Sequence, residues 1–471
     1  MTEQKPRQIA AQILQRRDAG IDFVEEILES TLARAHLSSP DRGLCQELVY
    51  GVVRWQAALD WLITQKTPGR TQKPALQQLL RLGLYQIFWL DRIPNHAAVN
   101  ETVEQAKQSG FGPQAGFVNA ILRSYLREFD ATKLLLADLK TSQPHIGFSH
   151  PEWLVTRWQK RWGAEKAARL MEWNNTPPKT LARVNSLKFR QDDFRESQTS
   201  ADDGTARHSV RAEGFSAGSG AHGVTRPTFL KDAGDLLTQW RDENVDYDFV
   251  RRDWFEENLM FELKSHPALA KLPSFQQGFF YIQDPSTLLA VRELNPQPGE
   301  TILDLCAAPG GKLTYIAQLM NNQGAIIAHD TSPERQKWVE KNCQRLGVTM
   351  AKTVLPADLG QTIADRILVD APCSNTGVMR RRVDLRWRIR PEEIDRLRAT
   401  QLDLLHQAAG KLKPGGTLVY STCSLEPEEN ENVVQEFLAT DASFQLETQR
   451  ELLPFADATD GAFVARLNKK I

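Results

Sequence analysis

The chain has 471 residues, which is more than one hydrophobic core usually fills, so we expect two or three domains. Its composition, 41% hydrophobic and 25% charged, is ordinary for a globular protein, and no apolar run approaches the ~18 residues that a membrane span needs. A formal net charge of −1 excludes a strongly basic or acidic protein, so any nucleic-acid binding must rest on local patches.

The N-terminus and the cysteines both indicate the compartment. The first twenty residues lack the apolar core of a signal peptide. The five cysteines contain no CxxC pair, which favours reduced thiols over a disulfide framework, and their long spacings argue against a zinc site. We therefore expect a cytoplasmic protein without metal or membrane contact. The cysteines are Cys45, Cys306, Cys343, Cys373 and Cys423.

Residues 1–140 read almost wholly as helices. Apolar residues recur there at spacings of three and four, as in Leu76, Leu79 and Leu80. Such stripes are most simply core packing, so the pattern predicts an all-α bundle with its own core.

Residues 144–290 form a second predicted domain, of α+β type, with many tryptophans and a strand-like run at Leu181–Phe189. Within it, the segment 195–227 is rich in Ser, Gly, Ala and Asp. Such a segment cannot bury enough apolar surface to offset its chain entropy, so we expect a flexible insertion. Order is predicted to resume at about Phe229.

Residues 291–471 alternate short β-rich runs with helical ones. The helical runs are Pro333–Leu346 and Glu392–Leu412, and a strand-like run at Phe463–Leu467 closes the chain. Alternation of this kind predicts a parallel, doubly wound α/β domain that binds ligands at the carboxyl ends of its strands.

A glycine loop, LDLCAAPGGK at Leu303–Lys312, follows the first strand-like run of this third domain. Strand, glycine turn and helix bring backbone N–H groups close to a ligand. Cys306 stands where a Walker loop has its first glycine, and the loop also lacks GxGxxG. Alone, the loop indicates a nucleotide-like ligand, although Gly310 and Gly311 as a structural turn is the alternative.

Two carboxylates follow the next strands. Asp330 comes ~20 residues past the glycines, where an acidic side chain accepts hydrogen bonds from a ribose. Ser332 is better placed than Asp330 to cap the following helix. Asp358 follows a third strand-like run, Lys352–Leu355, and either contacts an adenine or is an ordinary loop carboxylate.

Two cysteines end neighbouring strand-like runs: Cys373 in ILVDAPCSNTG and Cys423 in TLVYSTCSLEPEEN. A lone cysteine is usually an inert buried thiol, as we expect for Cys306 and Cys343. Two thiols beside a cofactor loop instead suit chemistry on a carbon that is not nucleophilic by itself, such as C5 of cytosine. Spacing alone does not say which thiol is the nucleophile.

The chemistry would need further groups. A thiolate that adds to C6 makes C5 nucleophilic, and a base must later remove the C5 proton so that the thiolate leaves. Asp370 can contact the edge of the base, Pro372 shapes the turn before Cys373, and Lys312 can support either the cofactor or the pyrimidine.

A basic run follows Cys373 directly. Arginines suit phosphates and an aromatic ring suits a splayed base, although a solvated charged face is the usual meaning of such a run. Its position after the predicted active-site loop favours RNA contact. The predicted RNA-binding residues are Arg380, Arg381, Arg382, Arg386 and Trp387.

Over nearly its whole length the chain resembles the Sun/Fmu-type (RsmB) bacterial ribosomal RNA cytosine-C5 methyltransferases. The resemblance rests on ELVYGVVRW in the first domain, RVNSLK and FYIQDPSTLL in the second, and DLCAAPGGK, DAPCSNTG and YSTCSLEPEEN in the third. It implies a NusB-like helical RNA-binding domain at 1–140, a linker domain at 144–290 and a Rossmann-like methyltransferase domain at 291–471.

The resemblance also implies roles. Cys423 would be the nucleophile, and Cys373 would assist release of the methylated RNA, with Asp370 and Lys312 beside them. The cofactor would be S-adenosylmethionine and the partner small-subunit (16S) ribosomal RNA, with the protein a monomer. The implied cofactor contacts are Cys306, Ala307, Ala308, Pro309, Gly310, Gly311, Lys312, Asp330, Arg335, Asp358 and Asp370.

The chain departs from the family pattern in two places. Leu313 follows Lys312, where the family usually has Thr or Ser, and residues 189–272 are longer than usual and match poorly. A transfer RNA cytosine-C5 methyltransferase stays an alternative on the same catalytic domain. Two more distant alternatives are a non-catalytic RNA-binding assembly factor and a nicotinamide-dependent oxidoreductase, which would not need the second thiol.

Overall fold

The structure is a computed structural model, and it describes residues 5–189, 233–355, 359–360 and 362–471. The predicted insertion at 195–227 and Asp358 therefore lie outside the described residues. The chain divides into two compact units. Unit 1 contains Met1–Pro178, Asn375–Pro391 and Pro454–Ala456, and unit 2 contains Lys179–Ser374, Glu392–Leu453 and Asp457–Ile471.

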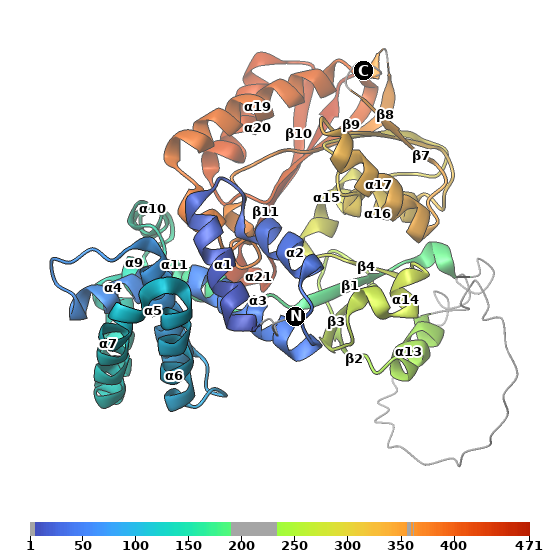
Figure 1. The fold of residues 1–471 in the computed structure, drawn as a ribbon. Coiled ribbons are helices and arrows are strands. Elements are labelled where there is room, and N and C mark those ends of the chain that lie inside the picture. Colours follow the sequence, from blue (N-terminus) through green and yellow to red (C-terminus); the bar gives the residue numbers. More distant parts are fainter. Residues whose placement is uncertain (1–4, 190–232, 356–358, 361) are drawn as a thin grey trace, which may run out of the picture. The chain divides into compact units, whose positions relative to one another are not determined.

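Unit 1 is helical (Figure 1). Its helices are α1 (Pro6–Ala19), α2 (Val24–Arg34), α3 (Ser39–Arg54), α4 (Gln56–Lys66), α5 (Pro74–Trp89), α6 (Asn95–Ala106), α7 (Ala115–Arg127), α8 (Phe129–Ser142), α9 (Pro144–Gly147), α10 (Glu152–Trp162), α11 (Ala164–Asn175) and α18 (Leu385–Arg388), and α21 (Pro454–Asp457) begins in it. Pro40, Pro74 and Pro144 open helices at first-turn positions, where the missing N–H costs nothing.

Helix α5 lies at the centre of the bundle. Leu79, Leu80, Leu82 and Leu84 are all buried, so apolar side chains on several sides of the helix are covered by its neighbours. Gly51 of α3 lets the ring of Tyr85 in α5 pack directly against the α3 backbone, because a Cβ at position 51 would lie 1.9 Å from that ring.

A distant segment completes the core of unit 1. Val383 belongs to the apolar cluster formed by α1–α7, and Trp387 packs against that cluster. The Trp387 indole also donates to the Val53 carbonyl at 2.7 Å. The segment 375–391, which follows the sequence DAPCS, is therefore part of the helical unit.

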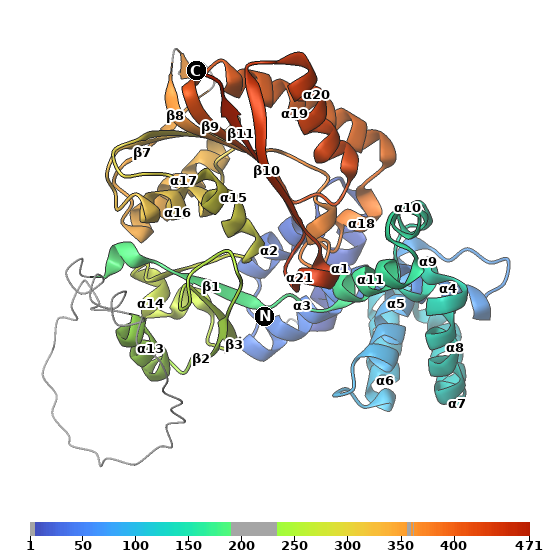
Figure 2. The same ribbon diagram turned by 180° about the vertical axis from the view of Figure 1, so that it is seen from behind.

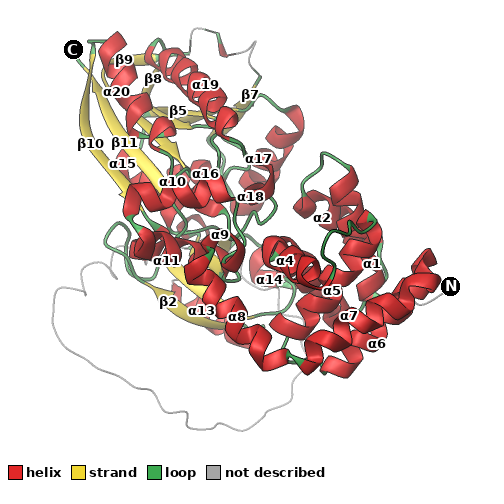
Figure 3. Ribbon diagram, turned by 90° about the vertical axis from the view of Figure 1, so that its left-hand side faces the viewer, coloured by secondary structure: helices red, strands yellow, loops and turns green. Residues whose placement is uncertain are grey.

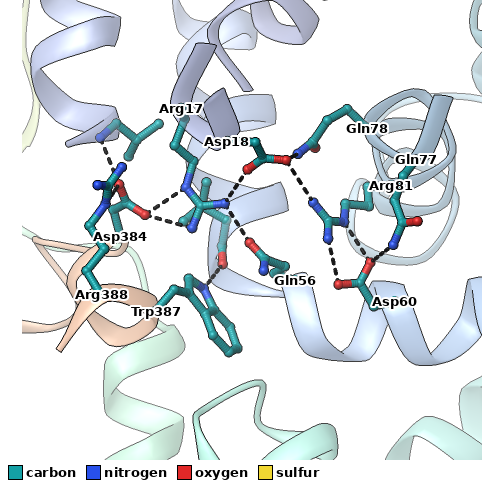
Figure 4. A network of polar contacts seen from close by, with 12 residues as sticks. Arg17, Asp18, Gln56, Asp60, Gln77, Gln78, Arg81, Asp384, Trp387 and Arg388 are labelled. Carbon is teal, nitrogen blue, oxygen red and sulfur yellow. Dashed lines mark hydrogen bonds and ion pairs between the residues drawn. The ribbon is translucent and has the colours of Figure 1, made fainter. Parts of the chain in front are cut away.

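Polar contacts anchor this segment (Figure 4). Asp384 is fully buried, and it accepts hydrogen bonds from Arg17 Nε at 2.7 Å, Val24 N at 3.0 Å and Arg388 Nε at 2.9 Å. The same network continues through Arg17 to Asp18.

Unit 2 contains a small antiparallel sheet of strand order β2-β3-β1-β4. The elements around it are β1 (Thr180–Val184), α13 (Ala233–Asp242), β2 (Asp246–Val250), β3 (Met260–Ser265), α14 (Pro273–Gln276) and β4 (Phe280–Ile282). Trp240 of α13 packs edge-on against Phe261 and Phe280, which joins the helix to one face of the sheet.

Unit 2 also contains a seven-stranded sheet of order β10-β11-β9-β8-β5-β6-β7 (Figures 2 and 3). Its strands are β5 (Thr301–Leu305), β6 (Ala325–His329), β7 (Ala351–Val354), β8 (Ala364–Asp370), β9 (Leu412–Thr422), β10 (Phe444–Leu452) and β11 (Ala462–Lys469). The helices that cover it are α15 (Ser286–Leu294), α16 (Gly311–Leu319), α17 (Pro333–Leu346), α19 (Pro391–Ala409) and α20 (Glu431–Thr440).

Helices lie on both faces of this sheet, because successive side chains of a strand point to opposite faces. Ile302 belongs to the cluster under α15, α16 and α17, whereas its neighbour Leu303 belongs to the cluster under α19 and α20. The predicted doubly wound α/β fold is confirmed.

The structure corrects two details of the prediction. The sheet is not wholly parallel, since β11 runs antiparallel to both β9 and β10. The helix predicted to reach Leu412 ends at Ala409, and Leu412 already begins β9. None of the helices in the described ranges is long and apolar enough to cross a membrane.

Candidate active site

The glycine loop connects β5 to α16 at the carboxyl edge of the large sheet. Gly310 has φ +102° and Cys306 has φ +70°, so the backbone turns sharply twice within five residues. The Ala307 N–H donates to the His329 carbonyl at 2.8 Å, which ties the loop to the end of β6. The predicted strand, glycine turn and helix are therefore present.

Asp330 follows β6 and supports this loop. Its buried carboxylate accepts from Ala308 N at 3.3 Å and from Ser332 N at 3.1 Å. Arg335 donates to the Ala308 carbonyl at 3.2 Å and lies 3.4 Å from the Asp330 carboxylate. Ser332, not Asp330, caps α17, because its hydroxyl accepts from the Arg335 N–H.

Two thiols meet at the same edge of the sheet. Strands β8 and β9 are parallel neighbours with Asp370 opposite Ser421, so the residues that follow them emerge side by side. The Sγ atoms of Cys373 and Cys423 lie 3.4 Å apart, and neither is in a disulfide. The structure thus brings together the two cysteines that the strand ends predicted.

Lys312 and Asp370 form an ion pair beside these thiols, with Nζ and Oδ2 2.7 Å apart. Burial lowers the pKa of Lys312, but the Asp370 carboxylate and, more weakly, Cys423 outweigh it and raise the pKa overall. Ser421 holds the other Asp370 oxygen through a 2.9 Å hydrogen bond.

The remaining cysteines of unit 2 are chemically quiet. Burial raises the pKa of Cys306 to about 12, and the nearby Asp370 and Asp304 carboxyls add to the rise. Burial likewise raises the pKa of Cys343 to about 12. Both therefore stay protonated at neutral pH, as expected of inert buried thiols.

Asp304 is a site residue that the sequence analysis missed. It is buried at the end of β5, and neither carboxylate oxygen has a hydrogen-bond partner among the described residues. Burial raises its pKa well above the usual range, and Asp370 acts in the same direction. The sequence clue to Asp304 was its position two residues before Cys306, at the start of the glycine loop.

Arg183 of β1 also supports the loop and was not predicted. The buried guanidinium donates to the Gly311 carbonyl at 2.8 Å and to the Thr314 hydroxyl at 2.9 Å. Burial lowers its pKa to about 10. The Thr314 hydroxyl in turn donates to the Gly311 carbonyl at 3.1 Å, so Arg183 and Thr314 hold the same loop carbonyl.

A buried carboxylate, Glu429, lies behind the two thiols. It accepts from the Ser374 N–H at 2.8 Å and from the Ser374 hydroxyl, and from the Ser424 hydroxyl at 2.5 Å. Ser374 follows Cys373 directly, and Ser424 follows Cys423. Burial raises the pKa of Glu429 above its ordinary value, and the hydrogen bonds from Ser374, Ser424 and Gln401 offset this rise only in part.

The predicted RNA-binding run lies in unit 1, and three of its members are structural. Arg386 is fully buried and donates to the carbonyls of Arg54, Ser149 and Asn174. Arg380 is buried with its guanidinium 4.1 Å from the centre of the Trp173 ring.

Trp387, the third structural member, has its indole N–H bonded to the Val53 carbonyl. Arg386 and Trp387 therefore hold the segment in the bundle instead of facing a ligand, a correction that follows from backbone acceptors distant in sequence. Arg381 is half-buried, and Arg382 is exposed.

A doubly wound sheet with one antiparallel strand, a glycine loop and an acidic residue after the second strand defines a Rossmann-like methyltransferase. Comparison with known protein families identifies the family to which the chain belongs. Residues 291–468 match the 16S rRNA methyltransferase RsmB/F family, residues 4–127 match the NusB family, and residues 150–215 match the RsmF/B-like ferredoxin-like domain. The chain belongs to the 16S rRNA methyltransferase RsmB/F family.

Curated relatives span the whole chain. A probable ribosomal RNA small subunit methyltransferase B of Bacillus subtilis is 34% identical and covers 100% of both chains. The ribosomal RNA small subunit methyltransferase B of Klebsiella pneumoniae is 34% identical over 96% of this chain and 98% of its own. The predicted NusB-like domain and family are confirmed.

Solved structures agree on the fold. The crystal structure of PH0851 is 23% identical, covers 99% of each chain and has a TM-score of 0.72, which shows the fold alone. A methyltransferase homolog protein from Pyrococcus horikoshii is 28% identical, covers 69% of this chain and 97% of its own, and has a TM-score of 0.53.

Proposed function

We propose that the protein methylates C5 of a cytosine in small-subunit ribosomal RNA, with S-adenosylmethionine as methyl donor and a covalent bond between Cys423 and C6 of the base. The observation that carries the proposal is the pair of thiols, 3.4 Å apart, at the strand edge that also holds the glycine loop. Methyl transfer to an oxygen or nitrogen would need neither thiol.

The residues at the strand edge fit the cofactor. The backbone of the loop Cys306–Lys312 and the carboxylate of Asp330 would hold it, and Arg335 would support both. The buried, unpartnered oxygens of Asp304 leave acceptor capacity that a ligand donor group can use. Asp358, outside the described residues, is proposed as a further contact. When bound, S-adenosylmethionine supplies an electrophilic methyl group.

Cys423 begins the reaction in this proposal. Its thiolate forms a bond to C6, and the electron pair of the C5–C6 double bond moves to C5, which accepts the methyl group. A base then takes the C5 proton, the electron pair of that C–H bond restores the double bond, and the C6–S bond breaks to return the thiolate. The Cys373 thiol is in place to assist this release.

Lys312 and Asp370 would assist from their position beside the thiols. The Lys312 ammonium stabilises the negative charge of the Cys423 thiolate and lies in an ion pair that fixes its position. Asp370, braced by Ser421, can contact the ring edge near N3 and, in its protonated form, donate a hydrogen bond there as charge accumulates when C6 is attacked.

The assignment to small-subunit RNA rests on the relatives and on the NusB match at residues 4–127. Labelled methyl from S-adenosylmethionine should appear as 5-methylcytosine in unmodified small-subunit ribosomal RNA. Label in transfer RNA alone would keep the chemistry and overturn the substrate. If neither the naked RNA nor the assembling subunit is labelled, the proposal that the protein is an enzyme is wrong, and the alternative of a non-catalytic assembly factor is favoured.

The roles of the two cysteines have a separate test. Cys373→Ala should accumulate a covalent RNA–protein adduct that survives denaturing electrophoresis, because addition can occur and release cannot. Cys423→Ala should form no adduct. The reverse pattern would exchange the two roles.

A further inference from the structure

The buried carboxylate of Glu429 joins two loops that are 50 residues apart in sequence. Glu429 ends a short 3-10 turn at Pro427–Glu429, six positions after Cys423. Its side chain is completely buried, so every acceptor position on it must be satisfied from inside the protein.

Each Glu429 oxygen accepts two hydrogen bonds. Oε1 accepts from Ser374 N at 2.8 Å and from Gln401 Nε2 at 3.1 Å. Oε2 accepts from both serine hydroxyls, which lie 3.0 Å from each other. One side chain therefore fixes the residue that follows Cys373 and the residue that follows Cys423.

The surroundings hold Glu429 in this position. The Tyr420 hydroxyl donates to the Glu429 backbone carbonyl at 2.6 Å, and Gln401 also donates to the Pro372 carbonyl at 2.9 Å. Asn430 donates to the Ser424 carbonyl at 3.0 Å. These contacts form a buried polar network that joins the residues next to the two thiols.

We propose that Glu429 is a positioning residue that sets the spacing of Cys373 and Cys423 and thereby governs release of the methylated base. This inference rests on the proposed function. Addition to C6 needs only Cys423, whereas release needs Cys373 close to C5 while Cys423 is still bonded to C6. Loss of the network should therefore slow release far more than adduct formation.

Two substitutions separate geometry from charge. Glu429→Ala removes all four acceptor contacts and leaves the Ser374 N–H buried without a partner. Glu429→Gln can keep all four, because its carbonyl can accept from Ser374 N and Gln401 while its amide donates to the two serine oxygens. A positioning role predicts that glutamine restores release.

Asp365→Ala is the matched control. Asp365 lies near the other end of β8, where its carboxylate accepts from Thr301 N at 2.8 Å and from Lys413 Nζ at 2.5 Å. The substitution removes two contacts of a carboxylate, one of them to a backbone N–H, without touching either thiol loop, so adduct decay should match that of the unaltered protein.

The experiment follows formation and decay of the covalent adduct on small-subunit ribosomal RNA by denaturing electrophoresis. Glu429→Ala should decay about 10- to 100-fold more slowly, a cost typical of a displaced catalytic group, with adduct formation little changed. Adduct decay at the normal rate in Glu429→Ala, or no rescue by Glu429→Gln, would overturn the inference.

Two further variants keep the test decisive. If Glu429→Ala does not fold, Ser424→Ala removes one hydroxyl contact and should show the same slowed decay, and normal decay there would overturn the inference. Cys373→Ala in the same gel separates the two proposals. If Cys373→Ala accumulates adduct while Glu429→Ala does not, only the proposed role of Glu429 is wrong. If Cys373→Ala forms no adduct, the proposed covalent chemistry is wrong.

Discussion

Arg17 and Asp384 form a buried ion pair although 367 positions separate them in the sequence, with Arg17 Nε 2.7 Å from Asp384 Oδ1. The side chains are 7% and 0% exposed. A buried pair adds little compared with an apolar pair, but removal of one partner leaves an uncompensated charge. The ion pair between Arg17 and Asp384 therefore holds the segment around Asp384 in the helical unit.

Asp384→Ala should lower the free energy of unfolding by about 3–5 kcal/mol, since it removes the buried acceptor of Arg17 Nε, Arg388 Nε and the Val24 N–H and leaves Arg17 only the partly exposed Asp18 as a counter-charge. The measurement is urea-induced unfolding. Glu128→Ala is the control, because it breaks a half-exposed pair with Lys66 and should cost at most about 1 kcal/mol. Equal losses in the two variants would contradict a buried, unscreened pair.

Arg386 and Arg382 should separate stability from RNA binding. Arg386→Ala leaves three buried carbonyls without their donor, so its unfolding midpoint should fall clearly. Arg382→Ala changes an exposed side chain, so its unfolding midpoint should stay unchanged. Its RNA affinity should fall, and the salt dependence of RNA binding should decrease by about the amount expected for one phosphate contact. Unchanged RNA binding in Arg382→Ala would remove that residue from the predicted interface.

Asp330→Ala should weaken S-adenosylmethionine binding about 10- to 100-fold, because it removes a charged acceptor that also orders the Ala308 N–H. Isothermal calorimetry measures the affinity directly, without RNA. Glu334→Ala, four positions on in the first turn of α17, is the control and should bind as the unaltered protein does. Full affinity in Asp330→Ala would exclude Asp330 from the site.

His150 should make the helical unit sensitive to acid. Burial, and then the charge of Arg386, lower the pKa of His150 well below 6.5. The folded protein thus keeps the ring neutral while the unfolded chain takes up a proton near pH 6.5. This contribution to stability is complete above pH 6.5 and is lost as pH falls below it, by up to about 1.4 kcal/mol per pH unit.

The control for this pH dependence is His150→Asn, which can still donate to the Phe148 carbonyl that the ring contacts at 2.7 Å. Urea unfolding between pH 8 and pH 5 should show a flatter pH profile for the variant. Parallel profiles would show that another group controls the acid sensitivity.

The sequence predicts the catalytic edge well because parallel strands end at one edge of a sheet. Cys373, Cys423, Lys312 and Asp370 each follow or begin at such an end, so apolar periodicity alone places them together. The antiparallel strand β11 was not foreseen, because a short apolar run does not reveal the direction in which it pairs.

Burial of charged residues is the part that sequence patterns do not reveal. Arg386 reads as one more arginine in a basic run, and only the fold brings the carbonyls of Arg54 and Ser149 to it. Glu429 likewise reads as one acid in the run EPEEN, and only the pairing of β8 with β9 surrounds it with serines. In both cases the partners come from distant positions.

The helical unit is discontinuous in the chain, since 375–391 and 454–456 return to it from the catalytic part of the sequence. A fragment that stops at Pro178 would therefore lose Asp384, the buried partner of Arg17, and would have a core that lacks Val383 and Trp387. A chimera that takes its helical unit from a relative must therefore exchange the segment 375–391 together with the N-terminal helices. The stability of the helical unit therefore depends on residues encoded more than 200 positions after its last N-terminal helix.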